Sequence, residues 1–200
     1  MAKPFTKGIS IFVLLAAAGA AGFLYLKKGP AAGFKEPPGA AGGQAALSGK
    51  SAFVGDTGYL IEFPSGYEVY AEMRGNTEIV FFYPKGGKPT TDESQYKALG
   101  MVRLEVSRPP EFNGKLATLE DLKKGVQYSL KNNKETFTLK EEPIGRAAFQ
   151  VNITLPVEIK QLFVDGAGVF YSFTGADEAF MYSLAESIKE SGGAGAPRAP

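Results

Sequence analysis

Residues 149–173 read FQVNITLPVEIKQLFVDGAGVFYSF, and this stretch decides the fold. From Phe149 to Leu155 apolar residues alternate with polar ones, which is the period of a β-strand with one buried face. A second strand is predicted over residues 157–164 and a third over residues 169–173. The residues between them, Asp165–Gly168, are typical of a hairpin connection. Consecutive strands with short connections predict an antiparallel sheet.

The sequence before this stretch shows the same alternation. It predicts strands over residues 59–63, 67–73, 79–83 and 102–106. In the last of these strands, Val102, Leu104 and Val106 alternate with the polar residues Arg103, Glu105 and Ser107. The segment Phe81–Tyr83 is apolar on both faces, which favours a central strand covered on both sides by helices.

Two amphipathic helices are predicted. The first begins at Thr118–Asp121, which has the pattern of a capping box, and ends near Asn132. The second begins at residues 174–177, carries Phe180, Leu184 and Ile188 on one face, and ends at Ser191. A further strand is predicted from Phe137. The order of four strands, a helix, four strands and a helix predicts an α+β domain over residues 51–190, in which helices pack on a mainly antiparallel sheet.

The composition excludes several kinds of chemistry. The chain has 200 residues, of which 44% are hydrophobic and 22% charged, as in an ordinary globular protein. It has no cysteine and no histidine. Thiol catalysis, disulfides, a lipoprotein anchor, zinc sites of the Cys/His type and histidine-based triads are therefore excluded. We expect no cofactor and no metal site.

Charge is distributed unevenly along the chain. Residues 1–50 hold six lysines and one acidic residue, whereas residues 51–190 hold 15 basic and 20 acidic residues. The near-neutral total therefore conceals a basic N-terminus and a mildly acidic body. An acidic body argues against nucleic acid as a partner, because nucleic-acid-binding domains usually carry a basic patch.

Residues 1–28 are predicted to be a membrane anchor. The 19 residues from Gly8 to Leu26 carry no charge and would span about 28 Å as a helix, close to the thickness of a bilayer's hydrocarbon core. Lysines flank this run on both sides. The residues expected to form the anchor and its flanks are Lys7, Ile9, Phe12, Leu15, Phe23, Leu26, Lys27 and Lys28.

A cleaved signal peptide is the alternative interpretation of the same segment. It would use the apolar run Ile9–Leu15 and the small residues Ala16–Ala21 as a cleavage region. The apolar stretch resumes at Phe23, which an anchor requires and a signal peptide does not, and this favours the anchor. We expect a single-pass protein of a bacterial inner membrane with its C-terminal domain in the periplasm, or a secreted protein if the segment is cleaved.

Residues 29–50 and 191–200 have the composition of flexible connections. Glycine, alanine and proline dominate both segments, and neither shows hydrophobic periodicity. We expect residues 29–50 to be a linker between the anchor and the domain, and residues 191–200 to be a tail.

The domain resembles the Mog1/PsbP-like fold family over about residues 53–191. The similar stretches are Tyr59–Tyr67 (YLIEFPSGY), Met101–Ser107, Thr118–Leu122, Gly145–Phe149 and Gly168–Thr174. Tyr67 stands where the family pattern has tryptophan. The resemblance implies a non-enzymatic α+β module that binds proteins or helps to assemble membrane complexes.

We therefore expect a membrane-tethered accessory domain that binds a protein partner. Residues 84–100 predict a long exposed loop, and loops on such scaffolds carry function. The candidate contact residues in this loop are Lys88, Asp92, Glu93 and Tyr96. One alternative is a periplasmic protein that binds a small ligand or lipid between the sheet and the helices.

The other alternative is a hydrolase that uses carboxylates alone. Paired acids occur at residues 92–93, 120–121, 141–142 and 177–178. Two of these pairs begin predicted helices, where the helix dipole favours acidic residues for structural reasons.

Overall fold

The computed structural model describes residues 49–141, 144–155 and 158–190. The predicted anchor Gly8–Leu26, nearly all of the linker and the tail lie outside the described residues. Within these ranges, no helix has both the length and the apolar character needed to cross a membrane. The described residues form an α+β structure, as predicted, with a seven-stranded antiparallel sheet and three helices.

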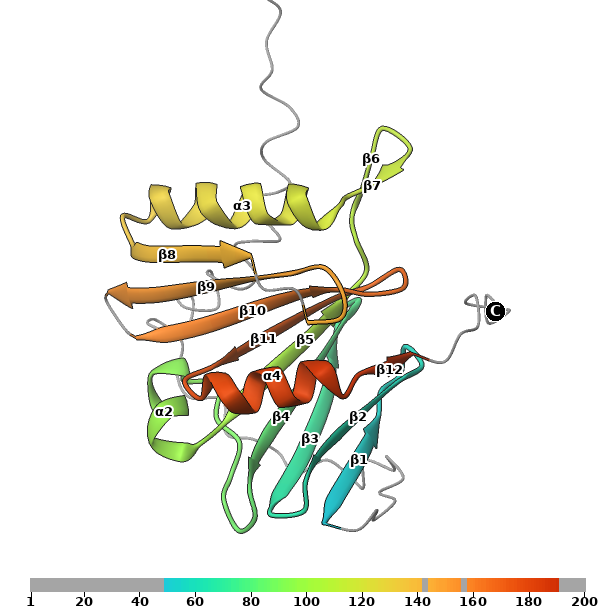
Figure 1. The fold of residues 1–200 in the computed structure, drawn as a ribbon, viewed down its shortest axis with the longest axis vertical. Coiled ribbons are helices and arrows are strands. Elements are labelled where there is room, and N and C mark those ends of the chain that lie inside the picture. The colour runs from blue at the N-terminus through green and yellow to red at the C-terminus, as the bar shows by residue number, and fades with distance from the viewer. Residues whose placement is uncertain (1–48, 142–143, 156–157, 191–200) are drawn as a thin grey trace, which may run out of the picture.

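The seven strands lie in the order β3-β4-β5-β11-β10-β9-β8 (Figure 1). Their bounds are β3 Tyr67–Arg74, β4 Thr77–Pro84, β5 Val102–Ser107, β8 Thr136–Glu141, β9 Ala148–Leu155, β10 Ile159–Asp165 and β11 Phe170–Gly175. A second sheet, in the order β1-β2-β12, consists of β1 Lys50–Val54, β2 Tyr59–Pro64 and β12 Lys189–Glu190. The remaining elements are the hairpin β6 Glu111–Phe112 and β7 Lys115–Leu116, the 3₁₀ turn η1 Glu93–Gln95, and the helices α2 Tyr96–Leu99, α3 Leu119–Asn132 and α4 Glu178–Glu186.

One face of the main sheet is covered by α4 together with the smaller sheet, and we call it the inner face (Figure 1). Phe63 of β2 meets Phe82 of β4 edge to face, with ring centroids 5.5 Å apart. Tyr67 of β3 lies against Phe180 of α4 at 4.4 Å. Burial of these rings holds three separate segments of the chain together.

The opposite, outer face is covered by α3 at one end and by α2 at the other. Val126 and Leu130 of α3 pack on β9 and β10, where the rings of Phe149 and Phe163 stack 4.7 Å apart. At the other end Tyr96 of α2 packs against strand β4. The predicted interior position of Phe81–Tyr83 is therefore confirmed, but on the inner face its cover includes a strand, β2, where a helix was expected.

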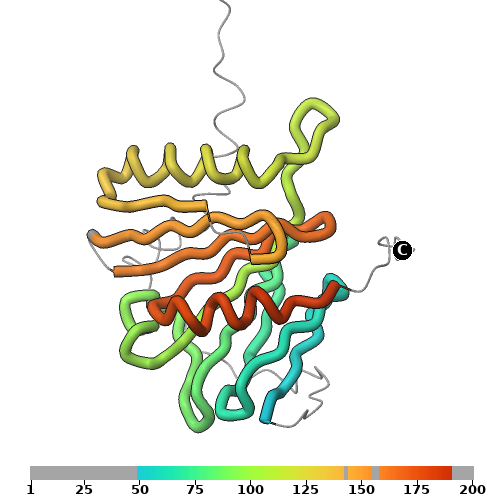
Figure 2. Tube along the Cα trace, viewed as in Figure 1, coloured from blue at the N-terminus to red at the C-terminus, as the bar shows by residue number. Residues whose placement is uncertain are grey.

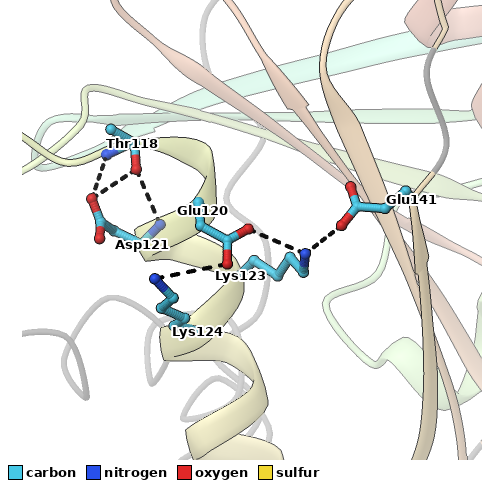
Figure 3. Close-up of polar contacts among 6 residues, drawn as sticks. All are labelled: Thr118, Glu120, Asp121, Lys123, Lys124 and Glu141. Atoms are coloured by element: carbon cyan, nitrogen blue, oxygen red, sulfur yellow. Dashed lines mark hydrogen bonds and ion pairs between the residues drawn. The ribbon is translucent and has the colours of Figure 1, made fainter.

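The capping box at the start of α3 is confirmed. The Thr118 hydroxyl accepts a hydrogen bond from the Asp121 N–H at 3.2 Å, and the Asp121 carboxylate accepts one from the Thr118 N–H at 3.0 Å (Figure 3). Lys123, one turn on, lies between Glu120 of the same helix and Glu141 of β8 (Figure 3). The start of α3 is thus fixed both within the helix and to the sheet.

The prediction for the last helix was wrong at its C-terminal end. The helix α4 ends at Glu186, and Ile188 is buried beyond it. The Ser187 hydroxyl accepts a hydrogen bond from the Glu62 N–H at 3.0 Å, which draws the chain onto β2. The following residues pair with β2 as β12, so segments from both ends of the domain flank β2 (Figure 2).

Candidate functional site

The predicted loop, residues 84–100, is more ordered than its composition suggested. It contains η1 and α2 rather than extended chain. The helix α2 ends at Leu99 and is capped by Gly100, whose positive φ of 61° suits a residue without a side chain. The Met101 N–H then donates to the Tyr96 carbonyl at 3.0 Å, and Met101 itself is buried. The loop therefore returns to the sheet through a closed helical turn.

A buried ion-pair cluster fixes this loop to the outer face of the sheet. The Arg103 guanidinium on β5 lies 2.6 Å from the Glu93 carboxylate of η1 and 3.1 Å from the Glu105 carboxylate of its own strand. The side chains of Arg103 and Glu93 are only 9% and 8% exposed. One guanidinium thus joins the sheet to the loop, and the buried Tyr96 adds a second attachment.

The electrostatics of the cluster follow from this burial. Burial raises the pKa of Glu93, and the positive charge of Arg103 only partly opposes it. Burial also raises the pKa of Tyr96, to about 12. For Arg103 burial acts to lower the pKa, but the carboxylates of Glu105 and Glu93 outweigh it and raise the pKa. The cluster therefore has a structural role, in which the burial of each charged group depends on the opposite charge beside it.

The structure separates the four predicted contact residues into two pairs. Glu93 and Tyr96 point toward the sheet and are buried, so they anchor the loop from beneath. Lys88 and Asp92 are exposed. The Asp92 carboxylate accepts hydrogen bonds from the backbone and side chain of Ser94 and from Gln95, and these hydrogen bonds lower its pKa.

The outer side of the loop presents a mixed surface. Leu99 is 40% exposed, which makes it one of the few large apolar residues exposed in the described part of the chain. Lys97, on the same helix, forms an exposed ion pair of 2.8 Å with Glu158 ahead of β10. The helix α2 therefore presents an apolar side chain beside charged and polar groups.

A second buried polar cluster lies on the inner face and was missed from the sequence. Glu78 of β4 is 3% exposed, and its carboxylate accepts from the Asp56 N–H at 3.1 Å. Burial raises the pKa of Glu78. The rings of Tyr59 and Tyr171 meet edge to face at 5.4 Å beside it, and burial also raises the pKa of both phenols. Glu78 alternates in step with Val80 and Phe82, which face inward, so the sequence pattern could have placed Glu78 on the inner face. Apolar residues on both faces of β4 obscured this alternation.

Two of the acidic pairs considered for catalysis are divided by the fold. Asp92 faces solvent while Glu93 is buried, so they do not share a site. Asp177 accepts from the Phe180 N–H at 3.0 Å and caps α4, while the neighbouring Glu178 pairs with Lys160 at 2.6 Å. In the described ranges, no group of three or more acidic side chains has the geometry of a metal site.

A scan against protein-family models finds no model that matches the chain, and a search of curated proteins finds no similar protein.

Proposed function

We propose that this chain is a membrane-tethered, non-enzymatic accessory domain outside the cytoplasm, which binds a protein of the same membrane through residues 84–100. The observation that carries the proposal is the anchoring of this loop by Glu93 and Tyr96. Because these two side chains are buried beneath the loop, the exposed residues Asp92 and Leu99, which lie on the same two helical turns, are held in place before any partner binds, and Lys88 is exposed ahead of them. A preformed surface binds without the entropic cost of ordering a mobile loop.

The tether is supported by the charge-free run Gly8–Leu26 and its flanking lysines. Membership of the Mog1/PsbP-like family is part of the same proposal. It is supported by the similar sequence stretches, and by the presence of an antiparallel sheet with one helix in mid-domain and another close to its end.

The two alternatives gain less support. A ligand site between α4 and the sheet would need open space there, yet the facing side chains are fully buried, among them Met181, Leu184 and Leu162. A hydrolase using carboxylates needs two acids at one site. The acids at residues 92–93 face different environments, and those at residues 120–121 and 177–178 lie at helix starts.

Membrane fractionation tests the tether. We expect the expressed full chain to stay with membranes through salt and carbonate washes, with an intact mass of 21.3 kDa. A soluble species lighter by about 20 residues would show cleavage of a signal peptide and contradict the tether.

Affinity capture from detergent-solubilised membranes tests the contact surface. The wild-type chain should retain a partner that the double variant Lys88→Glu, Leu99→Ser loses. The matched control is Tyr128→Ser, which changes a residue on α3 that is 48% exposed. Retention by the double variant, or loss in the control alone, would contradict the assignment.

A further inference from the structure

The strand β3 ends the main sheet and presents a long, regular edge. It pairs with β4 over all eight of its residues, from Tyr67↔Pro84 to Arg74↔Thr77, without a bulge. Among the described residues, no strand pairs with its other side. A straight, unpaired strand edge is a template on which another strand can pair.

The opposite edge of the same sheet is protected. The strand β8 has a register irregularity between Thr136 and Phe137, and its exposed face carries Lys140. Bulges and charged side chains, especially lysines, are among the devices by which proteins prevent pairing at an edge. The strand β3 has no bulge and no lysine, its charged residues Glu68, Glu72 and Arg74 are of both signs, and Met73 near its end is 49% exposed.

The geometry of the β3–β4 hairpin determines which backbone groups face outward. Arg74 pairs with Thr77 across a two-residue turn that includes Gly75 at a φ of 61°. The closing pair of such a hairpin exchanges both hydrogen bonds, and bonding residues alternate along the ladder. Val69, Ala71 and Met73 therefore direct their backbone groups away from β4, toward the open edge.

We propose that a second copy of this chain occupies the edge, with the two β3 strands antiparallel across a twofold axis. In the register that fits best, Ala71 of one copy lies opposite Ala71 of the other. Val69 of each copy then lies opposite Met73 of the other on the inner face. The three resulting residue pairs would exchange about six backbone hydrogen bonds. The two main sheets become one continuous sheet.

Charge complementarity on the outer face supports this register and this occupant. It places Glu68 of each copy opposite Arg74 of the other, so two ion pairs form by symmetry. Within one copy the Arg74 guanidinium already pairs with Glu72, but its side chain is 55% exposed and so remains accessible to Glu68 of the other copy, which has no ion-pair partner among the described residues. The register also places Tyr70 opposite Glu72 of the other copy; because the Tyr70 hydroxyl already donates to Glu72 of its own copy at 3.2 Å, the support for this register comes from Glu68 and Arg74.

The neighbouring registers lack this complementarity. Because residues opposite one another must share a face, the register can change only in steps that keep this parity. Centring the axis on Tyr70 places Glu68 opposite Glu72, and centring it on Glu72 places that residue opposite itself. Both arrangements bring like charges together, which destabilises a strand pair.

Charge reversal tests the pairing in the full chain, purified in a mild detergent and measured by sedimentation velocity. Glu68→Arg places arginine opposite arginine, and Arg74→Glu places glutamate opposite glutamate. Each should weaken dimerisation by about tenfold or more, because two pairs change at once. The double variant Glu68→Arg, Arg74→Glu reverses both pairs and should recover most of the affinity. Circular dichroism establishes that each variant is folded.

Cysteine crosslinking tests the register, and the absence of native cysteine makes it unambiguous. Cα atoms of a hydrogen-bonded antiparallel pair lie about 5.5 Å apart, within reach of a disulfide. Ala71→Cys should therefore form a covalent dimer under mild oxidation. Met73→Cys should not, because the two copies of Met73 lie four residues apart along the strand, about 13 Å. Met73 is well exposed, so random collision would crosslink it readily.

The outcomes separate the possible occupants of the edge. A dimer that Ala71→Cys traps, that either charge reversal weakens and that the double reversal restores supports the twofold pairing. Equal crosslinking at residues 71 and 73 would show unspecific association and overturn the proposal. A monomer in every variant, or a dimer indifferent to residues 68 and 74, would also overturn it and point to another segment or protein on this edge.

Discussion

The Arg103 guanidinium lies 2.6 Å from the Glu93 carboxylate, and both side chains are less than a tenth exposed. This pair connects a central strand of the sheet to the loop that we propose as the contact surface. A buried ion pair contributes little net stability when intact, but removing one partner leaves an uncompensated buried charge. The conformation of the loop therefore depends on Arg103 being in its place in the sheet.

Removing Arg103 should destabilise the domain strongly. Arg103→Met leaves the Glu93 carboxylate buried without its counter-charge, at a cost of about 3–5 kcal/mol in the free energy of unfolding. Chemical denaturation at pH 7 measures this cost. The loss should shrink near pH 4, because a neutral Glu93 no longer needs the guanidinium. Adding Glu93→Gln to Arg103→Met should recover part of the stability at pH 7, and no recovery would contradict the assigned role.

The pH dependence of stability should carry a signature of Glu78. Burial raises the pKa of Glu78 in the folded protein above its unfolded value, so the folded state binds the proton more tightly. The contribution of Glu78 is therefore fully present below the unfolded pKa and is lost as pH rises through the folded pKa. Asp56, Tyr59 and Tyr171 are the titratable groups that face Glu78.

Glu78→Gln isolates this effect, because glutamine stays neutral and can still accept a bond from Asp56. The variant should match the wild type in acid and become relatively more stable as pH rises toward 7. Denaturation series at several pH values measure the difference. A difference that is independent of pH would show that Glu78 does not titrate with the fold.

Thr118→Ala should cost about 1 kcal/mol by removing the acceptor that caps α3. Thr118→Ser keeps the hydroxyl and is the matched control. Urea denaturation measures both variants. If the two variants lost the same stability, the methyl group of Thr118 rather than its cap would be responsible.

Gly55→Ala should destabilise the domain by about 1–3 kcal/mol, because a Cβ at this position would lie 2.2 Å from the buried Tyr59 ring. Gly66→Ala is the matched control, since no atom lies within 4 Å of its Cβ position. Thermal denaturation compares the two variants. Equal stability of both would contradict the close packing of the β1–β2 turn on Tyr59.

The sequence predicted those elements whose own residues carry a complete signal. The helix α3 combines a capping box at Thr118 with an apolar stripe that includes Val126 and Leu130, and its bounds were predicted within a residue. In contrast, β1 is five residues long and follows directly on the linker composition, so no alternation marked it. The strand β12 depends on the hydrogen bond from Glu62 to Ser187, a long-range contact that periodicity cannot show.

The candidate site was predicted only in part for a similar reason. Alternation separated Arg103 from the apolar residues Val102 and Leu104 of its strand, and Arg103 lies on the face opposite to theirs. Alternation reports which residues share a face, but not which segment later covers that face. Glu93 and Tyr96 cover Arg103, so residues predicted as exposed contacts became buried anchors, while Lys88 and Asp92 remained exposed.

Site-specific photocrosslinking in intact membranes tests the central claim most directly. A photoreactive residue replaces Lys88, Leu99 or, as the control, Tyr128 in the full chain. We predict one discrete adduct with a different membrane protein from positions 88 and 99, and none from position 128. Adducts from position 128 alone, or no adduct from positions 88 and 99, would contradict a partner-binding role for residues 84–100.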